Sequence, residues 1–440
     1  MGSAREAALI TLTACERQGA WSDGYLKKAL REQELDKRDA ALASRLCYGV
    51  LQNRLLLDWQ LARFCNKRLE ALDAPVLCGL RAAVYQILFL DKIPPSAAVN
   101  EAVELTKKYC RNPRAAGMVN GILRAMLRQK DLPEPEGCDK AETLSLKYSH
   151  PLWLVEEFID TLGPEGAERL LEADNLQPPT AAQINPLRGT LEKLTEELRE
   201  TGAEATPHPW MPGCLLLSGG GDLERLAPFQ EGRFYVQDPA ARLAVTAAGV
   251  TPGQRVLDCC AAPGGKSFAA AIDMENQGEV ISCDIHPHKI KLLQAGRDRL
   301  GLSVITPCRQ SAAELREEWV DGFDTVITDV PCSGLGIIRK KPDIRYKDPK
   351  ALEGLPQVQR GILDNCARYV RPGGVLVYST CTVLRRENEG IVEEFLAGHP
   401  EFALEPFTLP EFGEQPGWIT FWPHIHGTDG FFVAKLRRKG

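Results

Sequence analysis

Residues 256–267, with the sequence V-L-D-C-C-A-A-P-G-G-K-S, place a short apolar run directly before a proline and two adjacent glycines. The apolar run predicts a buried strand, and the helix-forming residues that follow the glycines predict a helix. Adjacent glycines let the backbone approach a ligand closely, and the N-terminus of a helix offers free N–H groups to an anion. The segment therefore predicts a strand, a tight turn and a helix that together bind a carboxylate or phosphate group.

A second predicted strand, residues 279–283, leads directly into Asp284. An ordinary turn between a strand and a helix is the simpler interpretation of a Gly-Gly pair. However, Asp284 follows the glycines at roughly 20 residues, the spacing at which an acid reaches a ribose hydroxyl in doubly wound folds. The spacing G-x-G-x-x-G is absent, which disfavours a nicotinamide dehydrogenase. We therefore expect a nucleoside-containing cofactor of another kind.

Strands and helices alternate through the second half of the chain. The apolar runs predict five parallel strands at residues 255–259, 279–284, 303–306, 323–329 and 374–379, and residues 430–436 predict a late antiparallel strand. This alternation is typical of an α/β fold, a Rossmann-like doubly wound sheet.

The chain has 440 residues, more than one hydrophobic core usually serves. Apolar residues recur at helical spacing through most of the first 130 residues, which predicts an all-helical bundle. An acidic, proline-rich stretch at residues 133–137 predicts a linker, and a mixed segment follows. We therefore expect a helical domain at residues 1–132, a small α/β linker module at 133–231, and a catalytic domain at 232–440.

The formal net charge of −6 argues against nonspecific binding of polyanions, but it does not exclude local basic patches. Basic residues gather late in the helical region, where they indicate either solvated helix faces or a phosphate-binding surface. These residues are Lys107, Lys108, Arg111, Arg114, Arg124, Arg128 and Lys130.

No apolar run reaches membrane-spanning length, and the first residues lack the pattern of a secretory signal. We therefore expect a cytoplasmic protein without a membrane partner. The fourteen cysteines include no C-x-x-C pair, and the histidine pairs 286/288 and 424/426 lack a third ligand at metal spacing. We predict no metal ion. No heptad run appears, so a monomer is the default expectation.

Reactive side chains follow the predicted strands at the edge of the sheet where ligands bind in such folds. Gln310 comes after the third strand, Asp329 and Cys332 come after the fourth, and Cys381 comes after the fifth. A cysteine at a strand end is more often a buried structural residue than a nucleophile. Two cysteines and an aspartate beside a cofactor turn nevertheless indicate covalent catalysis, because a thiolate is the best side-chain nucleophile near neutral pH.

Three segments of the helical region resemble the NusB-like RNA-binding domain. They are D-K-R-D-A-A-L-A-S-R-L-C-Y-G-V-L-Q at residues 36–52, A-V-N-E-A-V-E-L-T-K-K-Y at 98–109, and V-N-G-I-L-R at 119–124. The resemblance implies contact with RNA, which the helical periodicity alone does not.

The catalytic region resembles the RNA 5-methylcytosine methyltransferases that use S-adenosyl-L-methionine, and with the NusB-like region the chain resembles the RsmB (Sun/Fmu) family. The motifs are D-C-C-A-A-P-G-G-K-S at 258–267, I-T-D-V-P-C-S-G-L-G at 327–336, R-K-K-P-D-I-R at 339–345, Y-S-T-C-T-V at 378–383, and E-N-E at 387–389. The resemblance implies methylation of carbon 5 of one cytosine in bacterial small-subunit (16S) ribosomal RNA.

The resemblance also implies roles for individual residues. It makes Cys381 the nucleophile and Cys332 the residue that assists product release, and it places Asp329 near the methyl-transfer centre. It implies that the cofactor contacts Cys260, Ala261, Ala262, Pro263, Gly264, Gly265, Lys266, Asp284, Asp329 and Gln310. The family commonly has an acid near the adenine after the third strand, whereas this chain offers Gln310 and Ser311. An amide oxygen can still accept a hydrogen bond from the adenine amino group.

A covalent mechanism suits a cytosine, because carbon 5 is too poor a nucleophile until a thiolate adds to carbon 6. The target atom lies within a stacked base, so we expect an unpaired or extruded cytosine. The basic clusters at 339–341 and 385–386 flank the two cysteine motifs, which favours contact with backbone phosphates over a solvated loop.

Two alternatives remain open from the sequence. The Pro-Cys motif of DNA cytosine-5 methyltransferases would make Cys332 the nucleophile instead. A noncatalytic RNA-binding or assembly protein with a vestigial cofactor domain belongs to a different class, and it would not bind S-adenosyl-L-methionine.

Overall fold

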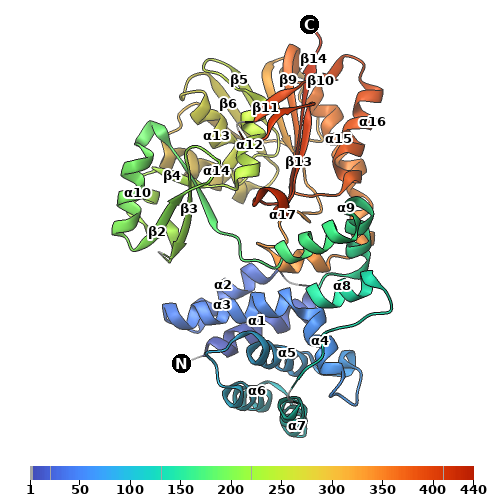
Figure 1. The fold of residues 1–440 in the computed structure, drawn as a ribbon. Helices are drawn as coiled ribbons and strands as arrows, with labels where there is room; N and C mark the ends of the chain where they lie inside the picture. The colour runs from blue at the N-terminus through green and yellow to red at the C-terminus, as the bar shows by residue number, and fades with distance from the viewer. Residues whose placement is uncertain (1–2, 20, 130, 220, 410) are drawn as a thin grey trace. The chain divides into compact units, whose positions relative to one another are not determined.

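The computed structural model describes residues 3–19, 21–129, 131–219, 221–409 and 411–440, and Figure 1 shows the helices and strands. Chain contacts divide it into two compact units. The first consists of Met1–Leu176 with Lys341–Lys347, and the second of Gln177–Lys340 with Asp348–Gly440.

The described residues of the first unit form helices joined by loops, with no strand among them. Its elements are α1 (Ala4–Gln18), α2 (Ser22–Glu32), α3 (Lys37–Gln52), α4 (Arg54–Ala62), η1 (Leu69–Ala71), α5 (Ala74–Phe89), α6 (Pro95–Tyr109), α7 (Ala115–Arg128), α8 (Lys140–Tyr148), α9 (Leu152–Ala173) and η5 (Pro342–Tyr346).

Helix α5 lies at the centre of this unit and packs against α1, α3, α4, α6 and α7. Its residues are therefore apolar around most of the helix circumference, as a helix surrounded by others requires. Helix starts at the periphery are set by polar caps: the side chain of Ser3 accepts a hydrogen bond from the Glu6 N–H, and Asp36 accepts one from the Asp39 N–H.

The segment Lys341–Lys347 belongs to the helical unit because Arg345 is fully buried there. Its Nη1 donates to the carbonyl oxygens of Gln52 at 3.0 Å and Ser149 at 3.2 Å, and to Oδ1 of Asn175 at 2.9 Å. A buried guanidinium is tolerated only when such acceptors surround it. Arg345 therefore fixes this segment of the chain within the first unit.

The second unit begins with a small antiparallel sheet in the order β2-β3-β1-β4. Helix α10 packs on it through Leu194 and Leu198, which share a buried cluster with Leu215 and Phe234. The elements are β1 (Thr180–Ile184), η2 (Pro186–Arg188), α10 (Leu191–Glu200), β2 (Ala203–Pro207), β3 (Cys214–Gly219), η3 (Leu223–Arg225), α11 (Ala227–Gln230) and β4 (Phe234–Val236).

The larger sheet of this unit has the order β10-β14-β9-β8-β5-β6-β7, with β13 paired to β14. The neighbouring pairs among β5 to β9 are parallel, whereas β14 runs antiparallel to β9, β10 and β13. The strands are β5 (Arg255–Asp258), β6 (Glu279–Asp284), β7 (Ile305–Arg309), β8 (Phe323–Asp329), β9 (Val370–Thr380), β10 (Phe402–Leu404), β13 (Trp418–Phe421) and β14 (Phe431–Arg438).

Helices and short elements surround this sheet. They are α12 (Pro239–Ala248), α13 (Gly265–Asp273), α14 (Pro287–Leu300), η4 (Glu317–Trp319), η6 (Pro349–Leu352), α15 (Leu355–Ala367), η7 (Arg385–Glu387), α16 (Glu389–Gly398), β11 (Phe407–Leu409), β12 (Gly413–Gln415) and α17 (Pro423–His426).

Both faces of the parallel strands are buried. Val256 and Ile327 share one core with α12 and α13, whereas the adjacent Leu257 and Val326 share the opposite core with α15 and α16. A sheet covered on both faces needs consecutive apolar residues, which is why the strands read as continuous apolar runs.

The predicted α/β fold is confirmed, and several strand boundaries differ from the prediction. The third strand begins at Ile305 and ends at Arg309, later than predicted, and the fifth begins at Val370. The order in which the chain adds strands to the sheet reverses between β5 and β8, and the carboxyl ends of strands at such a point form the ligand-binding crevice of doubly wound folds. Among the residues described, no helix is long and apolar enough to cross a membrane.

Candidate active site

The turn between β5 and α13 is held close to the sheet edge. The Ala261 N–H donates to the Cys283 carbonyl at the end of β6, at 2.8 Å. Gly264 has φ of +121°, and a Cβ atom there would lie 2.3 Å from the Phe268 ring. Only glycine fits at this position. The backbone at the start of α13 is therefore not covered by a side chain at residue 264.

A buried chain of polar groups lies directly behind this turn. Ser267 Oγ donates to Asp258 Oδ2 at 2.7 Å, and Ser282 Oγ donates to Ser267 Oγ at 2.7 Å. Burial raises the pKa of Asp258 to about 6, although the hydrogen bond from Ser267 acts in the opposite direction. The carboxyl group therefore ties β5 to α13 and β6, at a cost in desolvation.

Asp284 and Gln310 lie at the ends of neighbouring strands. Asp284 Oδ1 accepts from the His286 N–H at 2.9 Å, and Lys289 Nζ lies 3.4 Å from Oδ2. Gln310 Nε2 donates to the backbone carbonyl oxygens of Ser311 at 3.2 Å and Glu314 at 3.1 Å. These bonds use the donor group of the Gln310 amide, so its carbonyl oxygen points elsewhere and remains an acceptor.

Asp329 ends β8 and is held from two sides. Lys266 Nζ lies 2.7 Å from Oδ2, and Ser379 Oγ donates to Oδ1 at 3.0 Å. Lys266 comes from the turn at β5, and Ser379 is paired with Asp329 in the register of β8 and β9. The pair of Lys266 and Asp329 joins the predicted cofactor turn to the predicted catalytic residues, and its side chains are 9% and 31% exposed.

The two cysteines predicted for covalent chemistry meet beyond the ends of β8 and β9. The Sγ atoms of Cys332 and Cys381 lie 3.2 Å apart, and both residues are half-buried. The pKa of Cys332 is raised well above the ordinary thiol value, first by its hydrogen bond with Cys381 and then by burial and nearby negative charge. Cys332 therefore keeps its proton, and its sulfur lies within hydrogen-bond distance of the sulfur of Cys381.

Two residues of the basic cluster after Cys332 form ion pairs within the second unit, although Lys340 itself is exposed. Arg339 pairs with Asp429 at 3.0 Å and Asp238 at 3.6 Å, and Lys340 pairs with the same two carboxylates at 2.6 and 3.0 Å. The Arg339 side chain is only 9% exposed. The charges of Arg339 and Lys340 are thus balanced by carboxylates of the same unit, and their contact with backbone phosphates stays a prediction.

The basic residues of the helical unit divide into paired and unpaired groups. Lys107 pairs with Glu104, Lys108 pairs with Glu6, and Arg124 donates to Asn120. Arg111, Arg114 and Arg128 are exposed and form no ion pair with any described residue. Lys130 lies outside the described residues.

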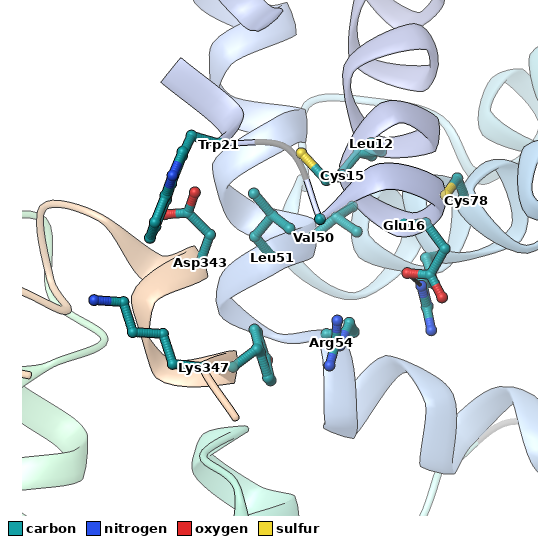
Figure 2. A pocket seen from close by; sticks show the side chains of 13 residues that line it. Leu12, Cys15, Glu16, Trp21, Val50, Leu51, Arg54, Cys78, Asp343 and Lys347 are labelled. Carbon is teal, nitrogen blue, oxygen red and sulfur yellow. Dashed lines mark hydrogen bonds and ion pairs between the residues drawn. The ribbon is translucent and has the colours of Figure 1, made fainter. Parts of the chain in front are cut away.

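A pocket of about 250 Å³ opens in the first unit (Figure 2). The Arg54 guanidinium stacks 3.7 Å from the centre of the Tyr346 ring. Other charges in it are satisfied locally, since Glu16 accepts from Arg81 at 2.8 Å and Asp343 accepts from Ser22 Oγ at 3.1 Å. The pocket is therefore mainly a product of helix packing.

Among the described residues, no group of three or more histidine, cysteine, aspartate or glutamate side chains is arranged to hold a metal ion.

The second unit has the fold of a Rossmann-like methyltransferase: a doubly wound sheet with a glycine turn at its switch point and acids at the ends of β6 and β8. The first unit is all-helical, as a NusB-like domain is. Comparisons with known proteins agree. The family described as "16S rRNA methyltransferase RsmB/F" matches residues 245–437, the NusB family matches residues 2–128, and the "Methyltr_RsmF/B-like, ferredoxin-like domain" matches residues 150–224.

Curated relatives match over nearly the whole chain. A Bacillus subtilis (strain 168) protein named "Probable ribosomal RNA small subunit methyltransferase B" is 36% identical over 448 residues, which cover 100% of this chain and 99% of that protein. A Synechocystis protein of the same name is 32% identical, with 100% of both chains covered. The solved structure titled "Crystal Structure of PH0851" has a TM-score of 0.84 and 28% identity, and covers 99% of this chain and 98% of its own.

The chain belongs to the RsmB/F family of small-subunit ribosomal RNA methyltransferases, which confirms the resemblance seen in the sequence.

Proposed function

We propose that this enzyme transfers a methyl group from S-adenosyl-L-methionine to carbon 5 of one cytosine in 16S ribosomal RNA, through a covalent bond between Cys381 and that cytosine. The observation that carries the proposal is the pair of cysteine sulfurs 3.2 Å apart beside the Lys266 and Asp329 ion pair. A methyltransferase acting on a nucleophilic nitrogen or oxygen would need neither sulfur.

The residues of the turn fit the proposed cofactor. Gly264 and Gly265 leave the start of α13 without side chains. A Cβ atom at Gly265 would lie 3.0 Å from Gln237 Nε2, so a larger residue would crowd that side chain. We assign the amino-acid part to this turn, the ribose to Asp284, the adenine to Gln310, and the region near the methyl group to Asp329. The turn comprises Cys260, Ala261, Ala262, Pro263, Gly264, Gly265 and Lys266. The bound cofactor supplies an electrophilic methyl group on a sulfonium.

The first step is the attack of the Cys381 thiolate on carbon 6 of the cytosine. A bond forms between sulfur and carbon 6, and carbon 5 becomes an enamine-like nucleophile that can take up the methyl group. Asp329 accepts a hydrogen bond from the amino group at the N3 edge of the ring and thereby stabilises the adduct. Lys266 and Ser379 hold the Asp329 carboxylate in position for this contact.

Cys332 completes the reaction. Its pKa is raised first by the hydrogen bond with Cys381, then by burial and by negative charge on Cys381. Once Cys381 is bonded to carbon 6, it is a neutral thioether, so the first and third effects end. Cys332 can then release its proton to solvent and take the proton from carbon 5, after which the bond between Cys381 and carbon 6 breaks.

The RNA presents an unpaired or extruded cytosine, because carbon 6 is inaccessible inside a base stack. The exposed arginines of the helical unit, Arg111, Arg114 and Arg128, supply phosphate contacts. A monomeric, cytoplasmic enzyme remains a prediction of the sequence.

The test is methyl transfer from labelled S-adenosyl-L-methionine to small-subunit RNA that lacks the modification. Wild type should yield labelled 5-methylcytosine after nuclease digestion, and Cys381→Ala should yield none while it still binds the cofactor. Label in another base would overturn the cytosine assignment. Failure of the wild type to bind S-adenosyl-L-methionine would support a noncatalytic RNA-binding protein.

A further inference from the structure

Two adjacent buried residues, Glu387 and Asn388, contact the two cysteine loops separately. Glu387 ends η7, Asn388 follows it directly before α16, and they are 1% and 0% exposed. Neither touches a cysteine sulfur through any hydrogen bond that the structure records, so their hydrogen bonds act on the cysteines through the loops.

Glu387 holds the loop that carries Cys332. Its Oε2 accepts from the Ser333 N–H at 2.8 Å and from Gln359 Nε2 at 2.8 Å. The same Gln359 Nε2 donates to the Pro331 carbonyl at 3.0 Å. The residues immediately before and after Cys332 are therefore fixed by one carboxylate and one amide.

Asn388 holds the loop that carries Cys381 in an equivalent way. Its Oδ1 accepts from Thr380 Oγ1 at 2.6 Å, and its Nδ2 donates to the Thr382 carbonyl at 3.0 Å. These two threonines flank Cys381 in the sequence. Ser333 Oγ also donates to Thr382 Oγ1 at 2.7 Å, which joins the two loops directly.

Stability alone does not account for a carboxylate at position 387. Its second oxygen, Oε1, is buried and has no hydrogen-bond partner among the described residues. A buried charge carries a large desolvation cost, and apolar residues of similar volume often stabilise such a site better. The carboxylate adds to the negative charge around Cys332, and that charge is one of the smaller causes that raise the pKa of this thiol.

We infer that Glu387 and Asn388 are positioning residues with separate tasks: Glu387, together with Gln359, holds Cys332 for the release of the product, and Asn388 holds Cys381 for the attack on the cytosine. The inference rests on the proposed covalent mechanism and assigns to that mechanism two residues that touch neither substrate nor cofactor.

The experiment compares covalent RNA adducts and methyl transfer in Glu387→Leu, Asn388→Ala and Cys332→Ala. Glu387→Leu should behave like Cys332→Ala: a denaturation-resistant adduct with small-subunit RNA accumulates, turnover falls at least tenfold, and the rate of adduct formation in a single turnover stays within about threefold of wild type. Asn388→Ala should lose both adduct and methyl transfer at least tenfold while it still binds S-adenosyl-L-methionine.

Two further variants keep the test decisive. Glu387→Gln retains an oxygen that accepts from Ser333 and Gln359, so it should restore most of the turnover that Glu387→Leu lacks. Gln359→Leu removes the bonds to Pro331 and to Glu387 Oε2 while residue 387 stays a glutamate that accepts from Ser333, and it should also accumulate adduct, even if Glu387→Leu does not fold.

Equal loss of adduct and turnover in the Glu387, Gln359 and Asn388 variants would overturn the division of tasks. Wild-type turnover without adduct in both Glu387→Leu and Gln359→Leu would do the same. The proposed function fails in a different way: Cys332→Ala itself would then form no adduct with RNA.

Discussion

The Sγ atoms of Cys332 and Cys381 lie 3.2 Å apart although the residues are 49 positions apart in the chain. They meet because β8 and β9 are parallel neighbours, paired from Thr325 and Val375 to Asp329 and Ser379. Cys332 lies three residues past the end of β8, and Cys381 directly follows β9. The sheet topology thus creates the sulfur pair, and the hydrogen bonds of the two loops set its spacing.

This pair predicts opposite behaviour of the two alanine variants. Cys332→Ala should form a covalent complex with small-subunit RNA that survives denaturing electrophoresis, because attack remains possible and release does not. Cys381→Ala should form none. The reverse pattern, an adduct with Cys381→Ala alone, would make Cys332 the nucleophile.

The ion pair between Lys266 and Asp329 predicts a catalytic effect of Lys266→Met. Hydrogen bonds to charged groups contribute about 1.5–3 kcal/mol, so the loss of this one should lower kcat by about 10- to 100-fold. Lys289→Met is the matched control, since the Lys289 side chain is 40% exposed and its Nζ lies 3.4 Å from the Asp284 carboxylate. Steady-state kinetics should show a change below about threefold for the control; equal losses would contradict a specific role for Lys266.

The exposed arginines of the helical unit predict a salt-dependent effect on RNA affinity. A variant with Arg111, Arg114 and Arg128 changed to alanine should bind small-subunit RNA more weakly. The slope of log affinity against log salt should fall by about 0.7–0.9 for each RNA phosphate that the variant no longer neutralises. Affinity for S-adenosyl-L-methionine should not change.

Lys107→Ala is the control for this triple variant, because Lys107 already pairs with Glu104 at 2.6 Å. It should leave the salt dependence of RNA binding as it is in wild type. An unchanged salt slope in the triple variant as well would show that the three arginines are only solvated.

The fold and the strand-end residues could be predicted because their signals are local. An apolar run that ends in a glycine turn, an aspartate or a Pro-Cys pair is visible within about ten residues, and parallel strands bring such ends to one edge. Asp284, Asp329, Cys332 and Cys381 all follow this logic, and each lies at or just past the end of β6, β8 or β9.

The partners of buried charges could not be predicted, because they lie far apart in the sequence. Lys340 bonds to Asp238 and Asp429, which are 102 and 89 positions away. A run of basic residues looks the same whether it meets solvent or distant carboxylates. Arg345 similarly belongs to a recognised motif, but no neighbouring residue in the sequence indicates that the helical unit encloses it.

We expect the substitution Arg345→Met to lower the free energy of unfolding strongly. The Arg345 guanidinium is fully buried and donates to Gln52, Ser149 and Asn175. Removal leaves these acceptors buried and unpaired, which costs about 1–3 kcal/mol each, so a total loss of about 3 kcal/mol or more is expected in urea unfolding. Lys28→Met should change the free energy of unfolding by less than about 1 kcal/mol, because the Lys28 and Glu32 pair is exposed. Similar effects of the two substitutions would refute the structural role of Arg345.

Asp258 predicts a characteristic pH dependence of stability. Burial raises its pKa to about 6, so the folded protein binds this proton more tightly than the unfolded chain does. The stability that it contributes is present below pH 4 and is lost as the pH rises through about 6. The difference between about 4 and about 6 corresponds to about 3 kcal/mol.

Asp258→Asn should remove this dependence, because the amide stays neutral and its oxygen can still accept from Ser267. The free energy of unfolding of the variant minus that of wild type should therefore increase as the pH rises from 4 to 7. Burial also raises the pKa of Asp429 to about 6, but Asp429 is present in both proteins and cancels in the difference.

Glu405→Gln is a control of opposite sign, because hydrogen bonding to Arg437 lowers the pKa of Glu405 to about 2. The stability from Glu405 is present above its unfolded pKa and is lost as the pH falls toward 2. A flat difference for Asp258→Asn from pH 4 to 7 would show that this carboxyl group ionises normally in the folded protein.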